Sequence, residues 1–388
     1  MARRTPEDLR LVLSQLSRWV ERGVERLKGR ENDTPIRELH LELTHRCDLK
    51  CVMCHHWEMP ARDPASVGRE LTPDEIRRFV SESELLKTVR FVAITGGEPL
   101  VRPEAVEIAA LLRARFREAS VGILTNLWNA GLLKRKLSEL AERGAGDVWL
   151  GSSLDGLGAT HDEVRGQPGA FAGFERSLEM LRRDFPKTAL SVNFTILPRN
   201  RGEIFAAYRW ARERGLGFGC QLVVNHEGFP APETFSWTDA ELSEVEEQVD
   251  LVLADLCRTQ KALERLLTAA PESRWLWSRM LYWRYLRAHG RGSPRFFDDC
   301  MAGRRYAMLD PEGNLFFCPV NKHKTVGSVR DEPFDRLWES PRARALRAEL
   351  IPCQCRCWLN CIANPVLDRV LSAAFDAPDP DAARTAPS

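Results

Sequence analysis

The stretch IRELHLELTHRCDLKCVMCHHW, residues 36–57, carries the most information about the fold. Its first nine residues, 36–44, form a short β-rich run, which is typical of a strand. Three cysteines follow directly, at Cys47, Cys51 and Cys54. The stretch therefore predicts a strand that ends in a cysteine-rich loop.

Strand-like and helix-like segments alternate downstream of this loop. Further β-rich runs occur at 90–95, 121–126, 148–155, 190–196 and 218–224, and amphipathic helical stretches lie near 73–86, 104–117, 131–143, 170–184 and 202–214. Thr72 followed by Pro73 is a typical helix start. Strands alternating with helices predict a parallel α/β sheet. Since six units are fewer than the eight of a closed TIM barrel, we expect an open, partial (β/α)6 barrel, with a flat doubly wound sheet as the alternative.

The pattern divides the chain into five expected parts. They are an N-terminal amphipathic helix in 1–35, the partial barrel in 36–235, a helical linker in 236–294, a cysteine-rich domain in 295–365 and a disordered tail in 366–388. The first helix is expected to pack on the body of the protein itself. In the linker, RWLWSRMLYWRYL (274–286) holds five aromatic residues that we expect in the core or covering a neighbouring element, with a substrate-facing wall as the alternative. A turn at 310–313 predicts a hairpin.

Composition excludes several classes of protein. The 56 basic and 55 acidic residues of the 388-residue chain give a net charge of +1, so no overall field attracts nucleic acid or an anionic membrane. We find no apolar run resembling a signal peptide or a membrane-spanning helix. Nine of the 11 cysteines fall in two tight groups, which favours metal binding or catalysis in a reducing, cytoplasmic compartment over disulfides.

The first cysteine group has the spacing CxxxCxxC, one thiolate short of a closed four-ligand site. His55 or His56 would complete a zinc site. A 4Fe-4S cluster held by three cysteines would instead leave one iron with an open position. The loop follows the C-terminal end of a strand, where parallel α/β folds bind ligands.

Four strand ends together resemble the radical S-adenosylmethionine (SAM) superfamily. Besides CxxxCxxC, the chain has Thr95-Gly96-Gly97-Glu98-Pro99, Thr125-Asn126, and Ser152-Ser153-Leu154-Asp155-Gly156 followed by His161-Asp162-Glu163-Val164-Arg165-Gly166. Taken singly, each is also compatible with an ordinary turn or helix cap. The resemblance implies that SAM is bound by Gly96, Gly97, Glu98, Pro99, Asn126, Ser153, Asp155, Arg165 and Asn193. The GGEP motif would contact the amino group of SAM, and Ser153, Asp155 and Arg165 its ribose and carboxylate. Met53 stands where many relatives carry an aromatic residue.

The resemblance also implies a chemistry. A reduced 4Fe-4S cluster with an open iron would chelate SAM and cleave it to a 5′-deoxyadenosyl radical, which removes a hydrogen atom from the substrate. The electron would come from a reductant such as flavodoxin or ferredoxin. The sequence identifies no acid or base for this step.

The second cysteine group resembles the SPASM/twitch extension of many radical SAM enzymes, which holds auxiliary iron–sulfur clusters. Its members are Cys300, Cys318, Cys353, Cys355, Cys357 and Cys361. Six thiols cannot fill two all-cysteine cubanes, so we expect one auxiliary cluster, held by Cys300, Cys318, Cys361 and one of the other three, with Cys357 as the first choice. Two clusters with incomplete ligation, or zinc, are the alternatives. Cys220 and Cys257 lie outside both groups and are expected to pack as small apolar residues.

The substrate is the least determined feature. About 35 residues precede the first strand, too few for a leader-peptide-binding domain, which favours a small molecule or lipid precursor. A peptide maturase is the second hypothesis, and a non-catalytic metal-binding or electron-carrier protein is the third. Asn225, His226 and Glu227, which follow the sixth strand, are candidate substrate contacts.

Overall fold

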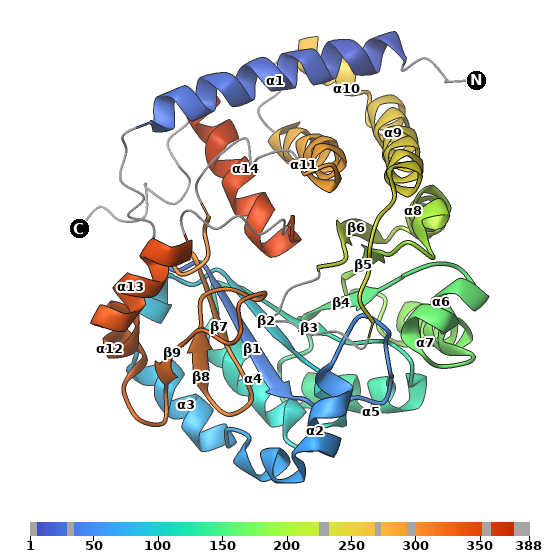
Figure 1. Ribbon diagram of the computed structural model, residues 1–388. Coiled ribbons are helices and arrows are strands. Elements are labelled where there is room, and N and C mark those ends of the chain that lie inside the picture. The colour runs from blue at the N-terminus through green and yellow to red at the C-terminus, as the bar shows by residue number, and fades with distance from the viewer. Residues whose placement is uncertain are drawn as a thin grey trace.

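A single mixed sheet organises the part of the chain that the computed structural model describes, which is residues 6–28, 35–224, 233–267, 273–292, 300–350 and 358–375. Its strands lie in the order β6-β5-β4-β3-β2-β1-β7-β8-β9 (Figure 1). They are β1 (Glu38–Thr44), β2 (Phe91–Gly96), β3 (Ser120–Leu124), β4 (Trp149–Ser153), β5 (Leu190–Ile196), β6 (Gly217–Leu222), β7 (Tyr306–Leu309), β8 (Asn314–Phe316) and β9 (Thr325–Ser328).

The six strands β1 to β6 are parallel and stand in consecutive order. Right-handed crossovers that always step in the same direction put their helices on one face of the sheet. A doubly wound sheet would reverse its strand order at a switch point, and this sheet does not. The expected partial barrel is therefore confirmed. The crossover helices are α3 (Pro73–Glu82), α4 (Ala105–Arg115), α5 (Ala130–Glu142), α6 (Ala159–Arg165), α7 (Ala170–Asp184) and α8 (Ile204–Glu213).

The strands that follow residue 300 extend this sheet. β7 pairs in parallel with β1, with Glu38 opposite Tyr306 and Leu41 opposite Leu309. β8 and β9 then add antiparallel. The predicted hairpin turn is present, because the Asp310 carboxylate accepts the backbone N–H groups of Glu312 and Asn314 at 3.0 and 2.9 Å. Cys300, just before β7, and Cys318, just after β8, are thus attached to the same sheet as the first cysteine loop.

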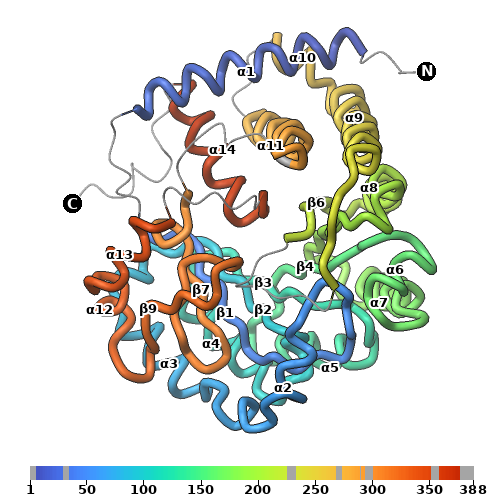
Figure 2. The backbone as a smooth tube through the Cα atoms, viewed as in Figure 1, coloured from blue at the N-terminus to red at the C-terminus, as the bar shows by residue number. Residues whose placement is uncertain are grey.

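A layer of helices covers the other side of the sheet (Figure 2). Its members are α1 (Glu7–Leu27), α9 (Asp239–Thr259), α10 (Ala262–Leu267), α11 (Arg274–Gly290) and α14 (Asn360–Ala374), while α12 (Phe334–Glu339) and α13 (Pro341–Leu350) lie beside β9 and the short α2 (Met59–Arg62) follows the cysteine loop. The apolar stripe of α1 is buried, as expected for packing on the protein itself. Trp19 of α1 meets Trp277 of α11 edge to face at 5.9 Å.

One expectation for the C-terminal tail is wrong. Residues 366–374 belong to helix α14 and are not disordered. The physical reason is an apolar stripe at helical spacing, which includes Val366, Val370 and Leu371 and is buried. Among the described helices, none combines the length and apolar character needed to cross a bilayer.

The remaining expectations concern side chains in this framework. Of the five aromatic residues in 274–286, three are buried in the core and one is partly buried, whereas Trp275 is 49% exposed, so the expectation for this segment holds only in part; the buried three are Trp277, Tyr282 and Trp283, and the partly buried one is Tyr285. Cys220 on β6 and Cys257 on α9 are also buried, as expected of small apolar residues.

Candidate active site

The first cysteine loop leaves the sheet at the end of β1. Cys51 is buried, and Cys47 and Cys54 are partly exposed. Burial, together with the neighbouring Cys51, raises the pKa of Cys47 to about 12 and that of Cys54 to about 11. These thiols would therefore ionise only beside a compensating positive charge, as metal ligands do.

The spacing of the cysteines distinguishes a cluster from a single ion. Among the described residues, one set of three or more metal-binding side chains has all its ligand atoms within 4.8 Å of one another, and it is Glu42, His45 and His56. The three loop cysteines are spread more widely. Two thiolates on one zinc ion lie at most about 4.6 Å apart, twice the Zn–S bond length. The loop therefore fits a multinuclear cluster better than zinc.

The end of helix α6 cradles this loop. Gly166 has a φ of +62°, and a Cβ atom there would lie 2.1 Å from the carbonyl oxygen of Lys50. Only glycine allows this contact. The preceding residue, Arg165, donates from Nη1 to Cys51 Sγ at 3.2 Å. The HDEVRG segment thus supports the loop by shape and by charge.

The glycines of the GGEP segment bring two backbones together. The N–H of Gly97 donates to the Thr44 carbonyl at 2.7 Å. A Cβ atom on Gly96, whose φ is +128°, would lie 2.3 Å from that same oxygen, and one on Gly97 would lie 2.2 Å from the Arg46 carbonyl. The GGEP segment is therefore fixed against the residues that lead into the cysteine loop.

Glu98 and Pro99, the last two residues of the GGEP segment, are both buried. The Glu98 carboxylate accepts the backbone N–H of Asn126 at 2.7 Å and that of Leu100 at 3.1 Å. Burial raises the pKa of Glu98 to about 7. The carboxylate consequently joins the ends of β2 and β3 to each other.

Asp155 is completely buried and holds Arg165 in place. Its Oδ2 atom lies 3.1 Å from Arg165 Nε, and its Oδ1 atom accepts the Thr195 N–H at 2.6 Å. Its own N–H donates to His161 Nδ1 at 3.1 Å. Asp155 therefore acts on the site through Arg165.

A cavity of about 1230 Å³ joins these parts. It is lined by the three loop cysteines and by Gly96, Gly97, Asn126, Ser153, Arg165 and Asn193. Arg165 Nη2 and Ser152 Oγ are buried at its wall, and neither atom has a hydrogen-bond partner in the described part of the chain. Glu98, Pro99 and Asp155 are not among the lining residues. Sequence analysis assigned no binding role to several residues that do line the cavity, including Thr95 and Ser152, which belong to the quoted motifs, and Gln221.

One described member of the second cysteine group reaches the same cavity. Cys361, at the start of α14, lines it. The Cys318 sulfur accepts the backbone N–H groups of Val320 and Asn321, both at 3.4 Å. Burial raises the pKa of Cys361, and the nearby Cys318 and Cys300 raise it further. Cys300, Cys318 and Cys361 therefore lie in one neighbourhood.

Two sets of predicted residues lie outside the described part of the chain. They are Cys353, Cys355 and Cys357 of the second group, and the candidate substrate contacts Asn225, His226 and Glu227.

Two family models match these two parts of the chain. Residues 41–211 match the radical SAM superfamily, and residues 300–361 match SPASM, an iron–sulfur cluster-binding domain. The chain belongs to the radical SAM superfamily. It is an enzyme whose cofactors are a 4Fe-4S cluster and SAM, with at least one auxiliary iron–sulfur cluster in its SPASM domain.

Relatives of this radical SAM enzyme differ in their named activities. The AdoMet-dependent heme synthase of Methanosarcina barkeri is 29% identical over 77% of this chain and 81% of its own. The pre-heme d1 synthase of Dinoroseobacter shibae is 26% identical over 77% and 72%. The mycofactocin maturase MftC of Mycobacterium ulcerans is 28% identical over 81% and 78%. The structure of anSMEcpe with bound AdoMet and Cp18Cys peptide shares the fold, with a TM-score of 0.54 and 16% identity over 80% of this chain and 82% of that one.

A buried ion network links the SPASM segment to the radical SAM site. Lys322, four residues after Cys318, donates to the Glu42 carboxylate and lies 3.1 Å from His56 Nε2. The other ring nitrogen of His56, Nδ1, lies 3.1 Å from the Gly96 carbonyl oxygen. Burial opposes ionisation of Glu42, yet Lys322 and then His56 lower its pKa. The ammonium group of Lys322 thus serves as the cation of the Glu42–His45–His56 set.

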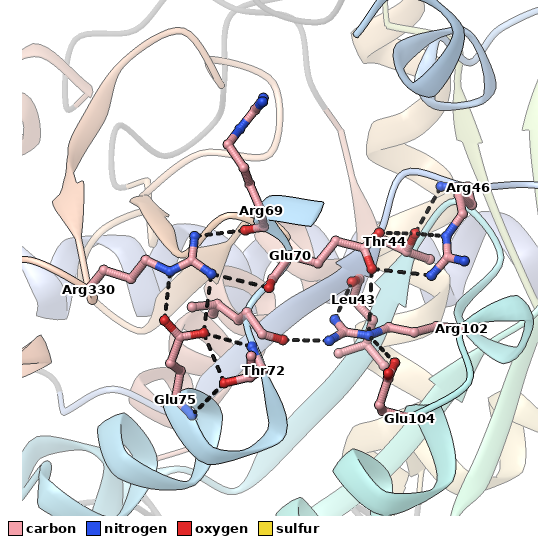
Figure 3. A network of polar contacts seen from close by, with 11 residues as sticks. Leu43, Thr44, Arg46, Arg69, Glu70, Thr72, Glu75, Arg102, Glu104 and Arg330 are labelled. Atoms are coloured by element: carbon pink, nitrogen blue, oxygen red, sulfur yellow. Dashed lines mark hydrogen bonds and ion pairs between the residues drawn. The ribbon is translucent and has the colours of Figure 1, made fainter. Parts of the chain in front are cut away.

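A second network fixes the base of the cysteine loop (Figure 3). Arg330, just after β9, donates from Nε to Glu75 at 2.8 Å and from Nη2 to the Glu70 carbonyl at 3.1 Å. Glu70 in turn accepts from the Thr44 hydroxyl and lies 3.7 Å from the buried Arg102. The SPASM segment therefore holds the radical SAM site from two directions.

Proposed function

We propose that this enzyme cleaves SAM reductively and uses the resulting 5′-deoxyadenosyl radical to remove a hydrogen atom from a small-molecule substrate. The observation that carries the proposal is the continuous cavity, which the three loop cysteines, the glycines of the GGEP segment and Cys361 all line. A substrate in this cavity would lie between the SAM site and the auxiliary cysteines.

Each predicted residue then has a role. Cys47, Cys51 and Cys54 would hold the 4Fe-4S cluster, which supplies the electron for SAM cleavage when it is bound. SAM would be bound by the cavity-lining members of the predicted set, which are Gly96, Gly97, Asn126, Ser153, Arg165 and Asn193. Glu98, Pro99 and Asp155 would position these residues from behind. The electron would arrive from a flavodoxin or ferredoxin.

The auxiliary cluster would be held by Cys300, Cys318, Cys361 and one of Cys353, Cys355 or Cys357, of which we favour Cys357. The N–H groups that point at Cys318 support its role, because donors to sulfur stabilise a metal-bound thiolate. Asn360 Nδ2 donates to Asn193 Oδ1 at 2.8 Å, so the start of α14 also reaches the SAM site. This contact supports a position near the substrate for the auxiliary cluster.

Among small molecules, we favour a tetrapyrrole, the ring system of haem. Two relatives that align over about three quarters of this chain are named a heme synthase and a pre-heme d1 synthase. A volume of about 1230 Å³ exceeds the roughly 300–1,000 Å³ typical of small-ligand sites. It therefore leaves room for a large flat substrate beside SAM.

The test is anaerobic reconstitution followed by iron and sulfide counting and a SAM-cleavage assay. About eight irons per chain are expected for one radical SAM cluster and one four-iron auxiliary cluster. Addition of a strong reductant and SAM should yield 5′-deoxyadenosine, and Cys51→Ala should abolish it. Bound zinc, or no cleavage by the iron-loaded protein, would refute the proposal and favour a non-catalytic metal-binding protein.

A peptide maturase is the second candidate, and its support is the alignment with MftC over 81% of this chain. It predicts that SAM cleavage is stimulated by a ribosomal precursor peptide encoded beside the gene, and not by tetrapyrroles. Comparison of 5′-deoxyadenosine yields with each type of substrate separates the two candidates.

A further inference from the structure

The cavity extends well beyond the SAM site, toward the N-terminal ends of the strands. In a closed TIM barrel, large branched side chains fill this interior in layers. Here the inward positions carry small residues, among them Ser120, Gly151, Ser191, Gly217 and Gly219, which line the cavity. The interior therefore stays open. We call this part the lower chamber, and it is bounded by Phe91, Trp149, Ser191, Gly217 and Arg279.

Aromatic rings form two sides of the lower chamber. Phe91 and Trp149 stack with their centroids 5.2 Å apart and an interplanar angle of 28°. Helix α11 contributes Trp275 and Trp283 to the lining. Trp149 Nε1 is buried, and no hydrogen-bond partner for it exists among the described residues. Since a buried indole N–H normally has an acceptor, a ligand atom is the natural partner.

Most charged side chains that line the cavity already have a polar partner on the protein. The pairs are Glu38 with His40 at 3.6 Å, Arg165 with Asp155 at 3.1 Å, His56 with Lys322 at 3.1 Å, and Asp368 with Ser278.

Arg279 is different. It is half-buried on α11, and its Nη2 donates to the Phe218 carbonyl at 2.7 Å. Within the described ranges no carboxylate lies at ion-pair distance from its guanidinium. A partly desolvated cation with only a neutral acceptor gains from a nearby anion, and a guanidinium suits a carboxylate in particular.

We infer that the lower chamber is the substrate site and that Arg279 binds an acidic group of a flat, aromatic-faced substrate. This inference rests on the proposed function and extends it, because it assigns the substrate a carboxylate and assigns that carboxylate a partner. The ring system would lie between the Phe91–Trp149 pair and the tryptophans of α11. Its reactive position would then point toward the SAM end of the cavity.

The test compares coproporphyrin III, a tetrapyrrole tetracarboxylic acid, with its tetramethyl ester. Each is titrated into the anaerobically reconstituted enzyme, and binding is followed by quenching of tryptophan fluorescence. We expect the wild type to prefer the free acid. Arg279→Met should weaken binding of the acid roughly tenfold, as expected for loss of a charged hydrogen bond, and leave the ester unchanged. Arg279→Lys should keep a preference for the acid.

Arg284→Met is the matched control. Arg284 also lies on α11 and also donates to a carbonyl, that of Leu13 at 3.3 Å, but it does not line the cavity. Equal binding of acid and ester, no binding of either, or equal effects of the two methionine variants would overturn the inference. SAM cleavage without substrate should persist in the wild type and in Arg284→Met. Its absence in the wild type would refute the proposed function instead.

Discussion

His161 is a buried neutral imidazole, 1% exposed, and its Nδ1 accepts the Asp155 N–H at 3.1 Å. Burial, together with the nearby Arg165, lowers its pKa to about 3. Protonation would put a hydrogen on the accepting nitrogen and a second cation beside Arg165. Asp155 holds Arg165, and Arg165 contacts the cysteine loop, so the position of both depends on a neutral His161 ring.

Because His161 is neutral in the folded protein, we expect the protein to lose stability as the pH is lowered. The ordinary pKa of histidine is 6.5, so between pH 6.5 and about 3 the unfolded chain binds a proton at His161 that the folded chain does not. The free energy of unfolding should fall by about 1.4 kcal/mol per pH unit below 6.5 from this residue. In His161→Asn the amide oxygen can still accept the Asp155 N–H, but the side chain does not titrate. The part of the pH dependence that His161 causes should therefore disappear.

The measurement is thermal unfolding of the holoenzyme at pH 7.5, 6.5 and 5.5. His55 and His56 also have lowered pKa values, so the wild type and the variant are compared at each pH. His323→Asn, at an exposed position, is the control. Parallel pH profiles for the wild type and His161→Asn would contradict the prediction.

Sequence motifs identified the candidate SAM-binding residues but not the direction in which each side chain points. Ser153 and Asp155 are two residues apart, which along a strand would put them on one face. However, β4 ends at Ser153, so the alternation stops there and Asp155 turns into the protein. The close approach of the backbone at Gly96 and Gly97 was predictable, because glycine is the residue that permits such an approach. Arg279 carried no motif, and its role depends on tertiary placement.

At the scale of elements, the segment 318–322 connects the two cysteine groups. Lys322→Met should leave Glu42 buried without its ammonium partner, which costs about 3–5 kcal/mol when one member of a buried pair is removed. Because His56 would lose its contact as well, Gly96 should be held less firmly. We expect roughly tenfold weaker SAM binding with both clusters retained.

SAM binding can be followed by the change that it causes in the electron paramagnetic resonance spectrum of the reduced cluster. Lys322→Met/Glu42→Gln should recover stability, since it removes both charges. Lys324→Met, which breaks an exposed pair with Glu349, is the control. Unchanged SAM affinity in Lys322→Met would show that the network does not position the site.

Helices α1 and α14 pack closely at one glycine. A Cβ atom on Gly23 would lie 2.1 Å from the Val370 carbonyl oxygen. Gly23→Ala should therefore lower the free energy of unfolding by about 1–3 kcal/mol, despite the better helix propensity of alanine. Gly68→Ala is the control, since nothing lies within 4 Å of a Cβ there. Thermal unfolding of both variants checks this, and equal midpoints would contradict it.

The elements themselves differed in how far sequence could predict them. The six parallel strands follow local β-rich runs, but the crossover rule fixes only the handedness of their connections, so the structure was needed to choose the consecutive order over a doubly wound one. Helix α14 was missed although Val366, Val370 and Leu371 have helical spacing, because the polar residues after 375 suggested disorder for the whole tail. The pairing of β7 with β1 joins residues far apart in sequence, and no local pattern specifies such a partner.

At the scale of the whole molecule, the SPASM hairpin is part of the central sheet. β1 is bonded to β2 on one side and to β7 on the other. A chain that ends at Gly292 would lose β7 to β9 and α14, which would expose an edge of β1 and the apolar stripe of α1. We expect this chain to aggregate, whereas a chain that ends at Phe375 should remain monodisperse. Size-exclusion chromatography of both checks the prediction, and a soluble, monodisperse short form would contradict it.

The parallel pairing of Glu38 with Tyr306 also has a consequence for biosynthesis. On the ribosome, β1 emerges long before the strand that completes its hydrogen bonding, by some tens of seconds at about 5–20 residues per second. During that interval the edge of β1 that β7 later covers stays unpaired on the nascent polypeptide, next to the thiols of the cysteine loop. The order of the strands therefore leaves this edge open to pairing with other chains until the SPASM segment has been synthesised.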